Sequence, residues 1–214
     1  MSKILITTVG EQEKPLYEGM KVSSRIDKVY LLASDFTANI AEKIKQNVSN
    51  LYQTEIIKIN EKELDNIINS LIKLHRKEKN SEFVYNLTGG TKIMSLACHV
   101  VASFLGEKMI YIFKKEGNGM EIIEVPVLKY NLNKIIAKGD KRHSILKLLK
   151  EKPRTITELA KILKLEKATV SAGHIKKLKE QNLVEIKELS RNKQSIILSK
   201  TGSIFLSLLE VGDG

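Results

Sequence analysis

Apolar and polar residues follow two different rhythms along the chain. In roughly the first 130 residues, short β-branched or aromatic runs alternate with longer segments whose apolar residues recur every three or four positions. The short runs predict strands and the longer segments predict helices. The expected strands are 4–9, 29–33, 54–59, 83–85, 109–113 and 121–125. One expected helix begins at Leu16, and the others cover 36–51, 64–75 and 93–105.

Alternation of strands and helices with short connections predicts an α/β domain with an open, mostly parallel sheet covered on both faces. The last two strands flank Glu116–Gly119, a sequence typical of a hairpin turn, so the sheet should end in an antiparallel edge. Ligands of such sheets lie beyond the carboxyl ends of the strands.

The rest of the chain has a helix-rich rhythm. Helices are expected at 143–150, at 156–163 and at 167–181, and Thr155 and Glu158 have the spacing of a capping box. Two alternating strands, 183–187 and 195–198, flank a basic loop, and a helix at 204–209 follows. This order predicts a winged helix-turn-helix domain.

The charge distribution supports a division between these two parts. The chain carries 36 Lys and Arg against 25 Asp and Glu, a net charge of +11. Residues 139–214 carry 16 basic and 9 acidic side chains, whereas residues 1–138 carry 20 and 16. We therefore expect a first domain at 1–130, a linker at 131–140 and a domain at 141–214 that meets nucleic-acid phosphates.

Several classes of protein are disfavoured by what the sequence contains. The single cysteine, Cys98, excludes a disulfide framework and a Cys-rich zinc site, and no His has metal-ligand spacing, so we expect no metal. The first residues enter a strand directly, without the features of a signal peptide. The longest uncharged stretch, 93–106, has 14 residues, fewer than the roughly 20 that span a bilayer. These features predict a soluble, cytoplasmic protein that does not enter a membrane.

The segment Asn86–Lys92, with the sequence NLTGGTK, contains the most informative short motif. It lies where a buried strand ends and a helix begins, where unpaired backbone amides and the helix dipole favour an anion. Its glycines permit close approach to the backbone, its threonines supply hydroxyls and Lys92 supplies a cation. The loop after the first strand, Thr7–Gly10, should line the same crevice. The alternative is a tight turn with an N-capping threonine.

The predicted helix-turn-helix offers a second candidate site. The residues expected to face DNA are basic or hydroxyl-bearing: Lys167, Thr169, Ser171, His174, Lys176, Lys177, Arg191 and Lys193. Ile175 and Leu178 should pack inward. Because Val170 and Leu178 are eight positions apart, one more than two regular helical turns supply, a bulge near Gly173 is expected. The alternative is a solvated basic face on an interaction domain.

With both motifs in place, the chain resembles CRISPR-associated regulators that join a CARF domain to a winged helix. The residues that carry the resemblance are Thr8–Gly10 with Pro15–Glu18, and Asn86–Lys92 with Met94. It implies a Rossmann-like CARF domain and a homodimer with one symmetric pocket for cyclic oligoadenylate, most often the tetramer, with double-stranded promoter DNA as the second partner. By the same resemblance, the ligand-contacting residues are Thr8, Gly10, Thr88, Gly89, Gly90, Thr91 and Lys92.

Three other functions are alternatives to this regulator. The first is a slow, metal-independent ring nuclease, in which Thr8 and Lys92 would assist attack by a ribose 2′-hydroxyl; the matched motifs hold no strong base, so we expect a regulator rather than an enzyme. The second is an effector ribonuclease, which the sequence disfavours because no His has an Arg five positions before it. The third is a winged-helix regulator that senses an unrelated nucleotide.

Overall fold

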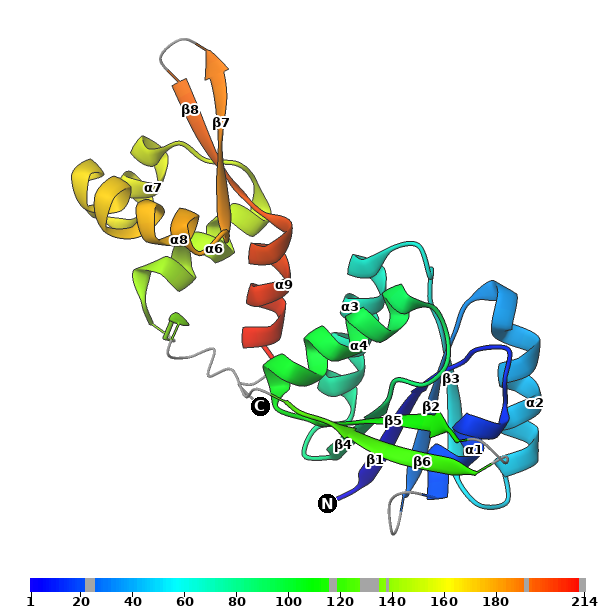
Figure 1. Ribbon diagram of the computed structural model, residues 1–214. Coiled ribbons are helices and arrows are strands. Elements are labelled where there is room, and N and C mark those ends of the chain that lie inside the picture. The colour runs from blue at the N-terminus through cyan, green and yellow to red at the C-terminus, as the bar shows by residue number, and fades with distance from the viewer. Residues whose placement is uncertain (22–25, 116–118, 128–134, 138, 191–192, 212–214) are drawn as a thin grey trace. The chain divides into compact units, whose positions relative to one another are not determined.

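The computed structural model describes residues 1–21, 26–115, 119–127, 135–137, 139–190 and 193–211. The chain forms two compact units, Met1–Tyr130 and Asn131–Asp213, hereafter the N-terminal and the C-terminal unit. Figure 1 shows the elements of both.

The N-terminal unit is a six-stranded sheet with helices on both faces. Its elements in chain order are β1 (Lys3–Thr8), α1 (Lys14–Lys21), β2 (Lys28–Ala33), α2 (Ala38–Val48), β3 (Gln53–Lys58), α3 (Leu64–Lys77), β4 (Glu82–Asn86), α4 (Lys92–Leu105), β5 (Lys108–Lys114) and β6 (Met120–Val125). The strand order is β3-β2-β1-β4-β5-β6. The first five strands are parallel and β6 pairs antiparallel with β5, which confirms the predicted α/β fold and its antiparallel edge.

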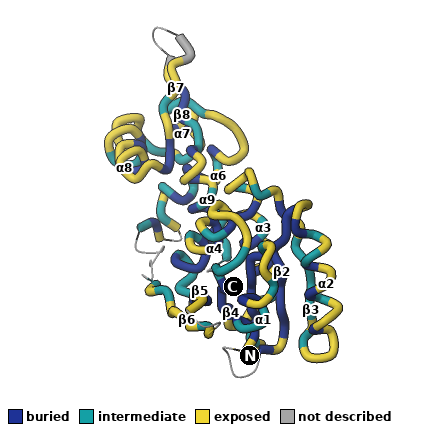
Figure 2. The backbone as a smooth tube through the Cα atoms, turned by 45° about the vertical axis from the view of Figure 1, so that its right-hand side comes forward, coloured by how far each residue is buried: buried dark blue, intermediate teal, exposed yellow. Residues whose placement is uncertain are grey.

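Successive residues of β1, β2 and β4 are buried, so both faces of these strands are covered. Figure 2 shows the buried residues of β2 in dark blue. Leu5, Val29 and Leu31 pack with α1 and α2, whereas the alternate positions Ile6 and Tyr30 belong to the opposite face of the sheet. The helices α3 and α4 cover that face (Figure 1). A strand that is covered on both sides needs apolar residues at every position, which is why the sequence shows continuous runs there rather than alternation.

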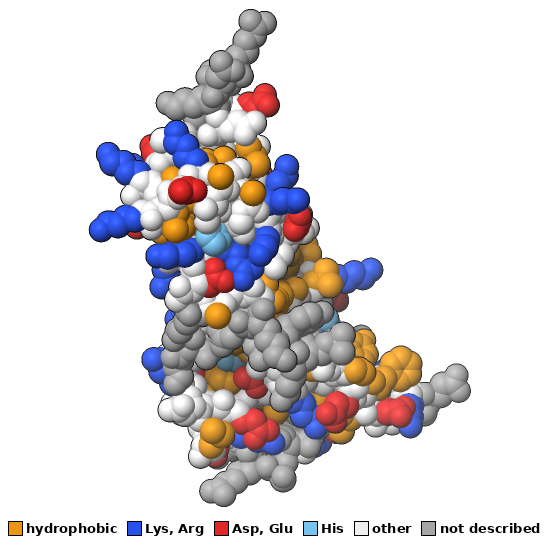
Figure 3. Space-filling model, turned by 90° about the vertical axis from the view of Figure 1, so that its left-hand side faces the viewer, with side chains coloured by type: hydrophobic (Ala, Val, Ile, Leu, Met, Phe, Trp, Pro, Cys, Tyr) orange, Lys and Arg blue, Asp and Glu red, His pale blue; other side chains and the backbone are white. Residues whose placement is uncertain are grey.

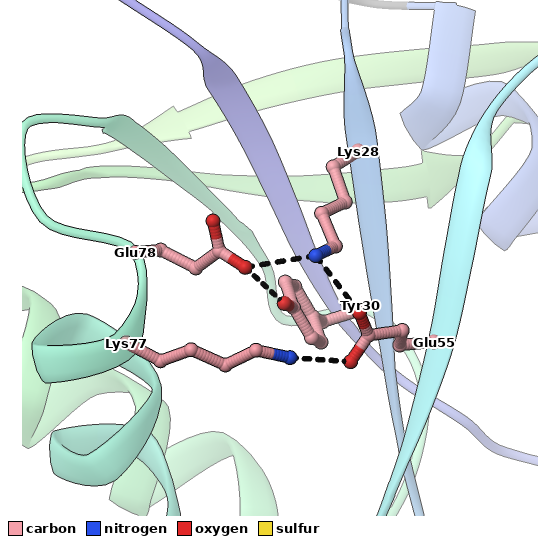
Figure 4. A network of polar contacts seen from close by, with 5 residues as sticks. All are labelled: Lys28, Tyr30, Glu55, Lys77 and Glu78. Atoms are coloured by element: carbon pink, nitrogen blue, oxygen red, sulfur yellow. Dashed lines mark hydrogen bonds and ion pairs between the residues drawn. The ribbon is translucent and has the colours of Figure 1, made fainter.

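A network of charges joins the beginnings of β2 and β3 to the end of α3 (Figure 4). The Lys28 ammonium lies 2.8 Å from the carboxylates of Glu55 and Glu78, and Lys77 lies 2.8 Å from Glu55. The Tyr30 hydroxyl donates to Glu78. Hydrogen bonds from Lys28 hold the pKa of both carboxyls below the ordinary value. Because each of these charges has an opposite partner, the network joins the end of α3 to β2 and β3.

The C-terminal unit has the elements α6 (Lys141–Glu151), α7 (Ile156–Leu163), a π-helical segment (Thr169–Ile175), α8 (Lys176–Glu180), β7 (Val184–Ser190), β8 (Lys193–Leu198) and α9 (Lys200–Leu209). Arg154 pairs with Ile196 through two backbone hydrogen bonds of 3.0 and 2.7 Å, so the β7–β8 hairpin gains a short third partner that the sequence did not predict. Helices followed by a β-hairpin confirm the predicted winged helix-turn-helix fold.

Candidate functional site

A cavity of about 620 Å³ opens at the carboxyl ends of the parallel strands. It lies at the point where the strand order reverses, between β1 and β4, which is where doubly wound sheets place their ligands. The residues that line it come from the loops after β1, β2, β3 and β4, from the first turns of α1 and α4, and from β5: Val9, Gly10, Glu11, Gln12, Pro15, Ser34, Phe36, Thr37, Glu61, Thr88, Gly89, Gly90, Thr91, Met94, Tyr111, Ile112, Phe113 and Lys114. The expectation that the loops after β1 and β4 share one crevice is confirmed.

These two loops interlock at the floor of the cavity. A Cβ atom on Gly89 would lie 2.1 Å from the Thr8 carbonyl oxygen, and one on Gly10 would lie 2.7 Å from the Gly90 nitrogen. The Thr8 hydroxyl donates to the Gly89 carbonyl at 2.5 Å. Gly90 has a φ of +73°, in the left-handed region that favours glycine. The glycines therefore let one loop approach the other, in addition to any room that they leave for a ligand.

Asn86 and Thr88 fasten the second loop to the sheet. The Thr88 hydroxyl donates to Asn86 Oδ1 at 2.6 Å and accepts from the Ile112 backbone N–H at 2.7 Å. The Thr88 N–H also donates to Asn86 Oδ1, at 3.1 Å. Since Asn86 is buried and Ile112 belongs to β5, the loop is held between two neighbouring strands.

The start of α4 forms one wall of the cavity. The Thr91 hydroxyl accepts from the Met94 N–H at 3.2 Å, which is the N-cap that begins the helix, and both residues line the cavity. The N–H groups of a first helical turn lack partners within the helix, and their dipoles favour a negative charge. The cavity therefore has an anion-favouring wall of backbone origin.

The structure places the seven predicted ligand residues in three settings. Five of them line the cavity: Gly10, Thr88, Gly89, Gly90 and Thr91. Thr8 lies beneath them, fully buried, with its hydroxyl bound to the loop. Lys92 is exposed at the first position of α4 and is not among the residues that line the cavity.

Sequence reasoning missed much of the cavity wall. Phe36 and Glu61 follow β2 and β3, and Tyr111, Phe113 and Lys114 lie on β5. The rings of Phe36, Tyr111 and Phe113 are exposed. Phe36 and Glu61 could have been predicted from the sequence, because every loop that follows a parallel strand lies at the same edge of the sheet.

The predicted DNA face lies mostly on the surface of the C-terminal unit. Five of its residues are exposed, namely Lys167, Thr169, Ser171, Lys176 and Lys177. Figure 3 shows Lys and Arg side chains gathered on the visible face of this unit. Arg191 lies outside the described residues, and so does the side chain of Lys193, which begins β8.

His174 differs from the other residues of the predicted DNA face because it is half-buried. Arg142, through its hydrogen bonds, holds the pKa of the Asp140 carboxyl below its ordinary value. The π-helical segment that carries His174 packs against α6, at whose start the Asp140 carboxylate accepts from the Arg142 N–H at 2.8 Å.

The expected irregularity of the recognition helix is a π-helical segment. The N–H of Lys176 donates to the carbonyl of Ser171, five residues earlier in the chain. In a regular α-helix it would donate to the carbonyl four residues earlier. The extra residue brings Val170, Ile175 and Leu178 to the inward side, and all three are buried. The predicted bulge near Gly173 is thereby confirmed.

The described part of the chain was compared with three common features: a metal site, a membrane-spanning helix and a reactive cysteine. Among those residues, no group of three or more His, Cys, Asp or Glu is arranged to hold a metal ion. No described helix is both long and apolar enough to cross a membrane. Cys98 is buried in α4, and burial raises the pKa of its thiol to about 12, so it is unsuited to nucleophilic chemistry.

The chain joins a Rossmann-like domain, which contains the cavity, to a winged helix-turn-helix domain. A family model described as the Card1 CARF domain matches residues 4–138, and the chain belongs to this family. A second model, of the helix-turn-helix of the arsR family of bacterial regulatory proteins, matches residues 139–185. The resemblance to CARF proteins with a DNA-binding domain is confirmed at this level.

Solved structures with a similar fold include three that are distant in sequence. Csm6 of Enterococcus italicus, bound to cyclic hexa-2′-fluoro-hexa-dAMP, is 16% identical over 70% of this chain and 46% of its own. Can2 from Sulfobacillus thermosulfidooxidans, in complex with cyclic tetra-adenylate, is 14% identical over 96% and 63%. Protein VC1899 from Vibrio cholerae is 11% identical over 98% and 66%. The TM-score is 0.47 for each. This chain thus spans about half to two thirds of their lengths, and no curated protein matches it.

Proposed function

We propose that the chain is a transcriptional regulator of a CRISPR system, which binds cyclic oligoadenylate in the N-terminal unit and promoter DNA through the C-terminal unit. The observation that carries the proposal is the cavity at the β1–β4 switch point of a CARF domain, joined in one chain to a basic helix-turn-helix. In this proposal the sensing domain is 1–130, the linker is 131–140 and the DNA-binding domain is 141–214.

The cavity suits a ring of phosphodiesters and adenine bases. A phosphate placed at Gly90 and Thr91 would meet the start of α4, and Lys92 would add a positive charge at the same helix end. Lys114 offers a second cation and Tyr111 an exposed ring on the β5 side. Thr8 would act on the ligand indirectly, by holding Gly89 in place. Cyclic tetra-adenylate is the ring that we expect.

A homodimer is part of this proposal. Exposed apolar side chains of α4 and of the β5–β6 hairpin lie on the same face of the sheet: Ile93, Leu96, Tyr111, Phe113 and Ile123. Their opposite neighbours Ile110 and Ile112 pack on the other face, with α1 and α2. A second copy placed against this apolar face would bury it and would bring two cavities to one two-fold axis.

DNA would meet the basic surface of the C-terminal unit. The π-helical segment and α8 turn Lys176 and Lys177 outward while Ile175 and Leu178 anchor them to the core. Lysines at such positions neutralise phosphates, so binding should weaken steeply with salt. Arg191 and Lys193 remain proposed contacts at the tip of the hairpin.

Ligand binding would regulate transcription by changing the affinity for a two-fold operator. For this coupling, the ring must bind two arrangements of the dimer with different affinity, and the ratio of those affinities limits the effect on DNA.

The test is calorimetric titration of the purified protein with cyclic tetra-adenylate, followed by promoter binding with and without the ring. We expect one ring per two chains and a change in DNA affinity of at least about fivefold. Linear tetra-adenylate, with the same bases, is the matched control and should bind more weakly. Absence of binding heat with every cyclic oligoadenylate, together with unchanged DNA affinity, would refute the proposal.

The ring-nuclease alternative is tested with the same ligand. Its proposed catalytic groups are Thr8 and Lys92, but the Thr8 hydroxyl already donates to the Gly89 carbonyl. Labelled cyclic tetra-adenylate, incubated without metal, should therefore stay intact on the timescale of DNA binding. Complete linearisation within minutes would favour the enzyme.

A further inference from the structure

The lining of the cavity includes residues of the loops that follow β2 and β3. Phe36 and Glu61 are two of them. The backbone hydrogen bond from Ile59 to Ala33 continues the pairing of the two strands to this point, and Ala33 pairs with Lys58. Phe36 and Glu61 each follow that pair by three residues, so they belong to neighbouring loops, and both line the cavity.

The Phe36 ring is exposed to solvent, which is unusual for a large apolar side chain. It is 78% exposed, more than any other aromatic ring among the described residues. Its backbone is fixed in a 3₁₀ turn, Asp35–Thr37, where the Ser34 N–H donates to the Thr37 hydroxyl and the Thr37 N–H donates to the Ser34 carbonyl. A rigidly mounted ring at the mouth of a cavity offers a flat surface on which a nucleic-acid base can stack.

Glu61, from the neighbouring loop, is half-buried and lines the same cavity. Within the described part of the chain it makes neither a hydrogen bond nor an ion pair, unlike Glu55 and Glu78 in the network of Figure 4. A carboxylate repels the phosphates of a nucleotide, so its favourable partners in such a ligand are N–H and O–H donors. The exocyclic amino group of a base is the donor that would lie next to a stacked ring.

We propose that Phe36 and Glu61 form a base-recognition subsite for a 6-aminopurine. The purine stacks on the Phe36 ring, and its exocyclic amino group donates a hydrogen bond to the Glu61 carboxylate. This inference rests on the proposed function, because it assigns the base of the same cyclic ligand. A purine with a 6-oxo group would instead direct an acceptor oxygen at the carboxylate and would be rejected.

The test compares cyclic tetra-adenylate with cyclic tetra-inosinate, whose bases carry oxygen in place of the amino group. Calorimetry on the full chain should give the wild type a preference for the adenylate ring of at least about tenfold. In Glu61→Gln this ratio should fall at least about tenfold, because an amide can donate to the oxo group as well as accept from the amino group. The matched control is Glu42→Gln, an exposed carboxylate on α2 outside the cavity, which should keep the wild-type ratio.

Phe36 is tested by a different readout. Phe36→Ala should weaken both rings by about tenfold or more and leave their ratio unchanged, whereas Phe36→Tyr should bind both as the wild type does. Because the ring is exposed, both variants should unfold at the wild-type temperature.

The outcomes separate this inference from the proposed function. A wild type that binds neither ring would refute the proposed function. A wild type that binds cyclic tetra-adenylate but does not discriminate against the inosinate ring, or a Glu61→Gln variant with an unchanged ratio, would overturn the base subsite alone.

Discussion

At the scale of single residues, the glycines and threonines of the two cavity loops mainly contact one another. Gly89 fits against the Thr8 carbonyl, the Thr8 hydroxyl holds the Gly89 carbonyl, and Thr88 bridges Asn86 and Ile112. From the sequence, these residue types indicated ligand contacts. The structure adds that the threonine hydroxyls form hydrogen bonds within the two loops and so hold the loops in place. In the proposed function, the backbone and the residues at the cavity rim would then contact the ligand.

Gly89→Ala should therefore destabilise the N-terminal unit. Its Cβ would lie 2.1 Å from a backbone oxygen, so the loops must separate. We expect the free energy of unfolding in urea to fall by about 1–3 kcal/mol, together with a loss of ligand binding. Gly119→Ala is the control, since its Cβ meets only the Lys115 side chain at 3.7 Å. Equal stability of the two variants would contradict this account of the loops.

His75 makes stability depend on pH. It is buried on α3, with Nε2 2.7 Å from the Tyr85 hydroxyl, and burial lowers its pKa from the ordinary 6.5 to about 3. As the pH falls below 6.5, the unfolded chain binds a proton that the folded chain does not, so the free energy of unfolding falls. The loss from this group should reach about 2 kcal/mol at pH 5.

The measurement is urea unfolding between pH 7 and 5, a window above the ordinary pKa of the carboxyls. His75→Gln should show a shallower slope of the free energy of unfolding against pH than the wild type, whatever its stability at pH 7. His99→Gln, on the exposed side of α4, should keep the wild-type slope. Parallel slopes in all three proteins would mean that His75 is protonated in the folded state as well.

At the scale of elements, the sequence located most helices and strands but not the way in which some of them end. The helix expected at 36–51 begins with the 3₁₀ turn Asp35–Thr37 and continues as α2 only to Val48. The pairing of Arg154 with Ile196 had no signal, because a single residue has no periodicity. In contrast, the π-helical segment was predictable, since the inward residues were one position too far apart for a regular helix.

The N-cap of α7 provides a test at this scale. Thr155 accepts from the Glu158 N–H at 3.2 Å, and the Glu158 carboxylate accepts from the Thr155 N–H at 2.6 Å, as the capping-box spacing predicted. Thr155→Ala should lower the free energy of unfolding of the C-terminal unit by about 1 kcal/mol. The same change at the exposed Thr157, within the helix, should have almost no effect in thermal unfolding. If both changes had equal effects, the cap would contribute nothing.

At the scale of the whole molecule, the proposed regulator depends on a second copy. Leu96 is 58% exposed on α4, in the apolar face that the proposed dimer buries. Leu96→Glu should raise the dimer dissociation constant at least about tenfold in sedimentation equilibrium and weaken ring binding with it. Leu51→Glu is the matched control, because Leu51 is 74% exposed just after α2, outside that face. A Leu96→Glu protein that is still dimeric would place the interface elsewhere.

The sequence by itself determined the α/β fold, the winged helix and the meeting of two loops at the β1–β4 switch point. Each of these follows from local periodicity and from the rule that parallel strands point their carboxyl ends to one edge. Only the tertiary structure decided which side chains reach the cavity. The hydroxyls of Thr8 and Thr88 donate hydrogen bonds to other groups of the protein. In contrast, Phe36 and Glu61, which belong to no sequence motif, line the cavity wall. Side-chain direction depends on packing between segments far apart in the chain, and no local pattern carries that information.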